Sequence, residues 1–168
     1  METSGSPPPS SDWKPTRRFL VIADGSDESP AAAFYAGLRA ADVGMGVVVL
    51  RAVEPAEFNH WLGIGAEMRE EARETAALEA ESLAHMVEEV CGRAPDIRLY
   101  DGSPRDALKK ALTEDPSIKV VVLASASGRR GPGPLVAALA AGKAIADRPV
   151  AVTVVPGGMS LEDIRAMA

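Results

Sequence analysis

Residues 19–30 read FLVIADGSDESP, an apolar run that meets an acid, then a Gly-Ser pair and a helix start. A short apolar run bounded by turn residues predicts a buried strand, here residues 19–23. In an open α/β sheet, ligands lie outside the carboxyl ends of the strands, so Asp24 stands where a ligand-facing acid is expected. Because Asp, Gly and Ser are also common turn residues, an ordinary turn and cap role for Asp24 is the competing interpretation.

The rest of the chain alternates apolar runs with stretches of helical periodicity. We predict strands at residues 19–23, 47–53, 96–100, 118–124 and 150–155. Helices are predicted at residues 66–90 and 135–146, and after the capping residues Ser29, Ser103 and Ser160. Pro30 and Pro104 each follow a cap, and proline favours the first position of a helix.

This alternation predicts one α/β domain with a five-stranded parallel sheet and helices on both faces. The first and fourth predicted strands are the most continuously apolar, so we place them side by side at the centre of the sheet. The crevice between their carboxyl ends is then the default ligand site, lined by residues 24–26 and 125–133.

Composition excludes several function classes. The chain has 168 residues, a net charge of -6 and a pI of about 5.0. Binding to nucleic acid or to anionic membranes needs a basic surface, so neither partner is expected. No apolar run approaches the length of a membrane span. Cys91 is the only cysteine, which fits a reducing, cytoplasmic setting. His60 and His85 have no partners at metal-ligand spacing, so no metal site is expected.

Residues 1–16 are rich in Pro and Ser, and we expect them to form a disordered lead to a domain that spans residues 17–168. Trp13 is the one residue of this lead that could tether it to the domain. The domain is expected to end in a short helix after Ser160.

Four motifs in the expected order resemble the universal stress protein family. They are Ile22-Ala23-Asp24-Gly25-Ser26, Leu50-Arg51-Ala52-Val53-Glu54-Pro55, Gly102-Ser103-Pro104 and Val150-Ala151-Val152-Thr153-Val154-Val155-Pro156. The likeness runs from about Arg18 to Pro156. It implies a flavodoxin-like (Rossmann-like) three-layer sandwich with strand order 3-2-1-4-5. It also implies a homodimer built through or near the fifth strand, residues 150–155.

Some members of that family bind ATP and others do not. By resemblance, the adenosine part of ATP would meet the first-strand acid and the second-strand exit, and the phosphates would meet a glycine-rich loop after the fourth strand. The residues of this chain at those places are Asp24, Gly25, Val53, Ser127, Gly128, Arg129 and Gly131.

The glycine-rich loop departs from the family pattern, which is Gly-x-x-Gly, nine residues, then Gly-Ser or Gly-Thr. Gly128 and Gly131 supply the opening, but Ala141 stands at the third glycine, and Gly142-Lys143 follows one position late. If Gly128 is the second glycine instead, Ser125 takes the first place and Ala138 the third. The loop also contains Gly131-Pro132-Gly133-Pro134, whose prolines lack the N–H groups that phosphate needs.

Two functions of different class remain open from the sequence. The first is a non-enzymatic stress-response or regulatory protein, with or without bound ATP. The second is an adenine-nucleotide α-hydrolase-type enzyme, because residues 24–29, DGSDES, faintly resemble the Ser-Gly-Gly-x-Asp-Ser loop of ATP pyrophosphatases. Only Gly25 represents the glycine pair of that loop.

Overall fold

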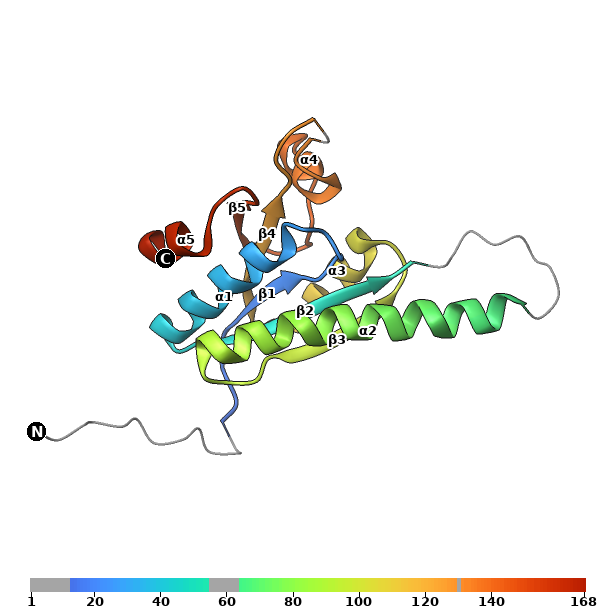
Figure 1. Cartoon of the computed structure of the whole chain (residues 1–168), viewed down its shortest axis with the longest axis horizontal. Helices are drawn as coiled ribbons and strands as arrows, with labels where there is room; N and C mark the ends of the chain where they lie inside the picture. The colour runs from blue at the N-terminus through green and yellow to red at the C-terminus, as the bar shows by residue number, and fades with distance from the viewer. Residues whose placement is uncertain (1–12, 55–63, 130) are drawn as a thin grey trace, which may run out of the picture.

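The computed structural model describes residues 13–54, 64–129 and 131–168, and within them strands and helices alternate strictly (Figure 1). The strands are β1 (Arg18–Ile22), β2 (Gly46–Val53), β3 (Asp96–Asp101), β4 (Ile118–Ser125) and β5 (Ala151–Pro156). The helices are α1 (Ser29–Val43), α2 (Ile64–Cys91), α3 (Pro104–Glu114), α4 (Pro134–Ala140) and α5 (Leu161–Met167). The predicted alternation is confirmed.

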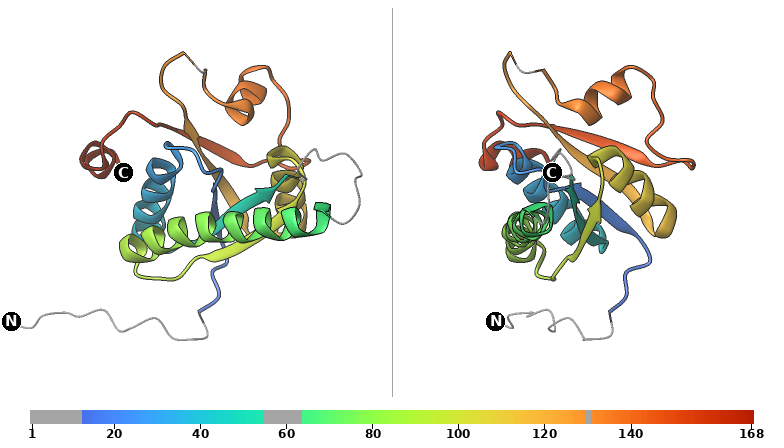
Figure 2. Two further views of the ribbon diagram at one scale, coloured as in Figure 1. Left: turned by 45° about the vertical axis from the view of Figure 1, so that its right-hand side comes forward. Right: turned by 90° about the vertical axis from the view of Figure 1, so that its right-hand side faces the viewer.

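All neighbouring strands are parallel, in the order β3-β2-β1-β4-β5. The predicted flavodoxin-like topology is therefore confirmed, as is the central pairing of β1 with β4. After β3 the chain reverses its direction across the sheet, and right-handed crossovers then place α3 and α4 on the opposite face. One face carries α1, α2 and α5 and the other carries α3 and α4, which makes three layers (Figure 2).

Alternate residues of β1 enter two separate cores. Phe19 and Val21 pack with α1 and α2, whereas Leu20 and Ile22 pack with α3 and the start of α4. A strand that is covered on both faces has no polar side, which explains the continuous apolar run in the sequence.

Two predicted helix boundaries are wrong. Ser29 is not the N-cap of α1, because the helix begins at Ser29 itself and Glu28 occupies the cap without a side-chain hydrogen bond. The helix predicted at residues 135–146 ends at Ala140, since Gly142 adopts a φ of 73° and the chain leaves the helix there. The predicted caps of α3 and α5 are confirmed: Ser103 and Ser160 each accept a hydrogen bond from the third residue of their helix.

Charged side chains join the strands at the amino edge of the sheet. Asp115 binds Arg98 at 2.7 Å and Arg18 at 3.5 Å, and it accepts hydrogen bonds from the backbone and side chain of Ser117. Arg148 donates to the carbonyl oxygens of Leu112 and Asp115. This network ties the start of β4 to β1 and β3, at the edge away from the predicted ligand site.

Trp13 lies against the domain. The guanidinium of Arg93, in the loop between α2 and β3, stacks over its ring at 4.3 Å from the ring centre. Pro15 packs against Gly46 at the start of β2. The rest of the predicted lead, residues 1–12, is outside the described residues. Among the helices that the structure describes, none combines the length and apolarity needed to cross a bilayer.

Candidate functional site

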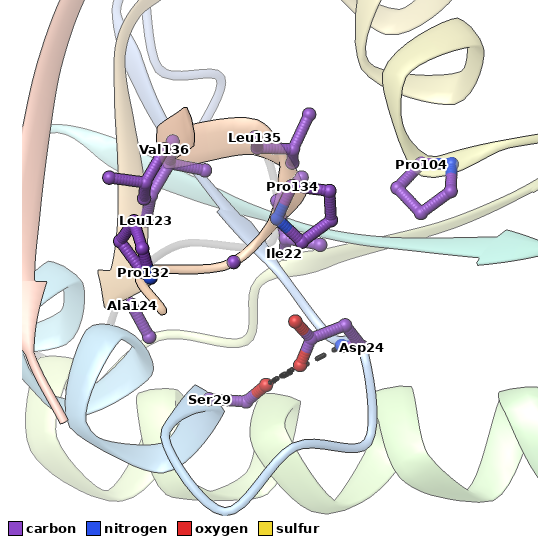
Figure 3. A pocket seen from close by; sticks show the side chains of 11 residues that line it. Ile22, Asp24, Ser29, Pro104, Leu123, Ala124, Pro132, Pro134, Leu135 and Val136 are labelled. Carbon is purple, nitrogen blue, oxygen red and sulfur yellow. Dashed lines mark hydrogen bonds between the residues drawn. The ribbon is translucent and has the colours of Figure 1, made fainter. Parts of the chain in front are cut away.

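A cleft of about 110 Å³ lies where the carboxyl ends of β1 and β4 meet (Figure 3). Its floor is formed by Ile22 of β1 and by Leu123 and Ala124 of β4, and one wall comes from the start of α4 and the loop before it. The residues that line it are Ile22, Asp24, Ser29, Pro104, Leu123, Ala124, Pro132, Gly133, Pro134, Leu135 and Val136. A cleft is thus present at the predicted place, but of the predicted lining, residues 24–26 and 125–133, only Asp24, Pro132 and Gly133 border it.

Asp24 is held by the loop that follows β1. Its Oδ1 atom accepts a hydrogen bond from the backbone N–H of Ser26 at 3.0 Å and another from the Ser29 hydroxyl. The Asp24 backbone N–H in turn donates to the Ser29 Oγ at 3.4 Å. The other carboxylate oxygen points away from Ser29 toward the loop that carries Pro132 (Figure 3). Asp24 therefore closes a turn and presents an acceptor to the cleft, so the two interpretations of this residue are compatible.

The carboxyl of Asp24 is ionised at neutral pH. Partial burial raises its pKa, but the hydrogen bonds from Ser26 and Ser29 outweigh that effect, so the pKa lies below its usual value. An ionised acceptor in an apolar cleft favours ligand groups that donate hydrogen bonds, such as the hydroxyls of a sugar.

The wall that faces Asp24 is apolar. Pro132, Pro134, Leu135 and Val136 supply most of it, and of the side chains that line the cleft only those of Asp24 and Ser29 are polar. Pro134 is the first residue of α4, so the first N–H of that helix is missing. The cleft therefore suits a flat or weakly polar group better than a phosphate.

The four predicted phosphate-binding residues lie on the loop between β4 and α4, beside the cleft rather than in its lining. Ser127, Gly128 and Arg129 are exposed, and Gly131 is half-buried. Gly128 and Gly131 have φ values of 98° and 74°, so the loop uses conformations that favour glycine. The neighbouring Arg130, which completes the Gly-x-x-Gly pattern, is outside the described residues.

Gly25 and Val53 also lie near the carboxyl ends of the strands, but outside the lining of the cleft. Gly25 lies next to Glu79 of α2, and its φ of 72° is a backbone conformation that residues with a side chain rarely adopt. Glu79 is bound by Arg51 of β2 at 2.7 Å. The Val53 carbonyl accepts the Gly102 N–H at 2.9 Å, and Val53 lines a separate hollow between β3 and the first half of α2. The structure therefore brings Asp24, but neither Gly25 nor Val53, to the lining of the cleft.

Several residues that line the cleft are outside the lining predicted from the sequence. Ser29 is predicted as a helix cap, although its hydroxyl fixes the carboxylate of Asp24. Pro104 reaches the cleft from the first turn of α3. The others are Ile22, Leu123, Ala124, Pro134, Leu135 and Val136. The sequence pattern -Asp-x-x-x-x-Ser- at a strand end was the available signal for Ser29, whereas nothing local signals Pro104.

Within the described residues there is no cluster of three or more His, Cys, Asp or Glu side chains that could hold a metal ion. His85 is exposed on α2 and lies 3.8 Å from Glu89. His60 is outside the described residues.

Comparison with known proteins agrees with this architecture. The family model described as the universal stress protein family matches residues 15–156. UspA from Lactobacillus plantarum has a TM-score of 0.68 at 17% identity, covering 85% of this chain and 99% of that chain. A universal stress protein family member from Burkholderia pseudomallei has a TM-score of 0.61 at 19% identity, covering 84% of this chain and 96% of that chain.

A universal stress protein solved in complex with cAMP has a TM-score of 0.59 at 20% identity, covering 83% of this chain and 96% of that chain. No protein with a curated description is similar enough in sequence to count as a relative. At these identities the solved structures establish the fold, whereas the family match spans most of the sequence. The chain belongs to the universal stress protein family.

Proposed function

We propose that this protein is a non-enzymatic stress-response regulator that binds an adenine nucleotide in the cleft between β1 and β4. The observation that carries the proposal is the geometry of Asp24, whose one oxygen is fixed by Ser26 and Ser29 while the other faces an apolar cleft at the centre of the sheet. In that position the free oxygen can accept a hydrogen bond from a ribose hydroxyl or an exocyclic amine. A solved universal stress protein with bound cAMP supports an adenine nucleotide as the ligand class.

The nucleoside end of such a ligand fits the residues present better than the phosphate end does. The apolar wall of Pro132, Pro134 and Leu135 can cover a base or a ribose. For the phosphates, the exposed loop offers backbone N–H groups at Ser127, Gly128 and Arg129 together with the charge of Arg129. ATP is therefore the finer form of the proposal, with its phosphates outside the cleft, along this loop.

The cleft must widen to admit a nucleotide. Its volume of about 110 Å³ is below the roughly 300–1,000 Å³ of pockets that hold small molecules. Pro132 and Gly133 form the part of the wall most able to move, because they lie between β4 and α4, outside both elements.

Replacement of Asp24 by Asn tests the proposal. Asp24→Asn should weaken the binding of cAMP and of ATP about tenfold or more, because a hydrogen bond to a charged group contributes roughly 1.5–3 kcal/mol. Isothermal titration calorimetry with each nucleotide, with and without Mg²⁺, provides the measurement. Asp27→Asn is the matched control, since Asp27 is exposed on the same loop. Wild-type binding that is indifferent to Asp24→Asn would place the ligand elsewhere.

The enzyme alternative rests on the faint ATP-pyrophosphatase resemblance of residues 24–29, and it predicts release of AMP and pyrophosphate with turnover. Incubation of purified protein with ATP and Mg²⁺, followed by chromatography of the nucleotides, separates the two functions. A non-enzymatic regulator is expected either to keep bound ATP intact or to bind no ATP at all. Multiple turnovers that Asp24→Asn abolishes would replace the regulator by an enzyme.

A homodimer through β5 and a cytoplasmic location complete the proposal, without nucleic-acid or membrane partners. The acidic balance of the chain and its single cysteine support the location and the choice of partners. The position of β5 at the edge of the sheet supports the dimer.

A further inference from the structure

The C-terminal segment, residues 157–168, follows the part of the chain that the family model matches, which ends at residue 156. We infer that this segment is a strut that holds together the two loops bordering the cleft, and that its docking opposes the binding of a nucleotide. The inference rests on the proposed function for the identity of the ligand. Gly157 and Ile164 are the positioning residues in this arrangement.

The first contact of the strut is at Gly157. Its N–H donates to the Ser125 carbonyl at 2.8 Å, at the root of the loop between β4 and α4. Gly157 also packs directly on the side chain of Glu28, in the loop between β1 and α1. A methyl group added to Gly157 would overlap Glu28 and lie 2.9 Å from the Ser125 carbonyl oxygen. Gly157 thus contacts both the loop that carries Asp24 and the root of the loop that carries the proline wall.

The second contact anchors the segment to the body of the domain. Ser160 and Asp163 form a reciprocal capping box at the start of α5. Ile164 is fully buried in the core shared by α1 and α2, and the Arg165 guanidinium lies 5.3 Å from the centre of the Phe34 ring in α1. Figure 2 shows α5 beside α1, on the same side of the sheet. Docking of α5 therefore keeps Gly157 in its place between the loops.

Ligand entry and strut docking then compete. A nucleotide needs a wider cleft than the one present, and widening it moves the loop that begins at Ser125. While Gly157 bridges Ser125 and Glu28, that movement costs free energy, and the fraction of molecules with an open cleft is reduced. Undocking α5 should raise this fraction and with it the observed affinity. By linkage, a bound nucleotide must weaken the docking of α5 by the same factor.

Ile164→Ala is the test variant, and Leu161→Ala is its matched control because Leu161 belongs to the same helix and is 47% exposed. We expect Ile164→Ala to raise the affinity for cAMP and ATP about fivefold or more, in the usual range of coupling between two sites. Leu161→Ala should leave the nucleotide affinity unchanged. Ile164→Val, which keeps most of the buried side chain, should have an affinity close to that of the wild type. A merely structural role for α5 would leave the affinity equal or lower it, and either result overturns the strut.

Hydrogen exchange without ligand gives a second readout, which does not depend on the proposed function. Ile164→Ala should accelerate amide exchange at residues 24–29 and 125–129, while Leu161→Ala should not. Gly157→Ala should accelerate exchange at the same loops with α5 still docked. If no variant binds a nucleotide, the proposed ligand is wrong while the exchange still tests the strut. If exchange at both loops equals that of the wild type although residues 161–167 are undocked, the strut is refuted.

Discussion

Asp115, just before β4, and Asp24, just after β1, are both aspartates in loops next to central strands, yet their surroundings give them different tasks. Asp115, at the amino edge of the sheet, meets Arg98 and Arg18 and accepts hydrogen bonds from Ser117. Asp24, at the carboxyl edge, meets only neutral donors from its own loop and keeps one oxygen toward the cleft. The first arrangement pairs the charge and stabilises the fold, whereas the second leaves the charge available for a ligand.

Stability should depend on pH through Asp115. Burial raises the pKa of the Asp115 carboxyl, but the hydrogen bonds from Ser117 and Arg98 lower it by more than burial raises it. The pKa in the folded state therefore lies below its ordinary value of 3.8. The unfolded state then binds the proton more readily. The stabilising contribution is fully present above the ordinary value and is lost as the pH falls through the folded-state pKa.

Asp115→Asn should therefore lower the free energy of unfolding by about 2 kcal/mol at neutral pH, as expected for hydrogen bonds to a charged group. The difference from the wild type should shrink on acidification through and below the ordinary pKa of the carboxyl. Urea unfolding at a series of pH values measures it. Asp42→Asn serves as the control, because the Asp42 side chain is 60% exposed and its ion pair with Arg39 contributes about 0.5 kcal/mol or less. Equal effects of the two variants would contradict the role of Asp115.

At the scale of single elements, the two edge strands differ in what they expose. β3 carries charges at its edge, with Asp96, Arg98 and Asp101 along its length. β5 has the sequence AVTVVP and carries no charge at all. Natural sheets protect their edges with charged residues, and an uncharged apolar edge indicates a covered one. β5 is for this reason the edge at which we expect a second copy of the chain.

A charge on β5 should therefore separate the proposed dimer. Val154 of β5 and Ile97 of β3 are each 41% exposed, which makes them a matched pair on the two edges. Val154→Lys should convert the dimer to a monomer at micromolar concentration, whereas Ile97→Lys should leave it dimeric. Size-exclusion chromatography with light scattering gives the masses. A monomeric wild type, or a dimer that survives Val154→Lys, would show that β5 is not the interface.

On the scale of the whole molecule, both ends of the described chain pack on the domain. Trp13 lies under the Arg93 guanidinium at the amino edge of the sheet, and Ile164 is buried near α1. The family model matches residues 15–156, so both Trp13 and Ile164 lie outside the matched range. Changes at either end should alter stability without disturbing the sheet.

Two truncations measure the contribution of Trp13. Deletion of residues 1–12 should leave the melting temperature unchanged. Deletion of residues 1–14 also removes the stacking on Arg93, which contributes about 0.5–2 kcal/mol as a cation–π contact. The melting temperature should decrease by about 2–4 °C for each kcal/mol of stability that is lost, which is the usual sensitivity for a domain of this size. Thermal unfolding followed by circular dichroism tests it, and identical melting of the two truncated proteins would show that Trp13 contributes nothing.

The sequence by itself determined the architecture, because the relevant signals are local. The apolar run of β1, the β-branched run of β2 and the caps Ser103 and Ser160 each specify their element through neighbouring residues. Alternation of such elements leaves few topologies, since crossovers are right-handed. The same reasoning placed Asp24 at the crevice, because every strand of a parallel sheet ends at the same edge.

Only the tertiary structure decided how that crevice is built. It assigned Ser29 to Asp24 rather than to the helix cap, because the hydroxyl finds a charged acceptor across the turn. It turned Pro132 and Pro134 toward the cleft, and it brought Gly157 into contact with both Ser125 and Glu28. The pair of Ser29 and Asp24 is local, five residues apart, but the other contacts join segments far apart in the chain. Their energy depends on distances that only the packed layers establish, so no local pattern of residues could reveal them.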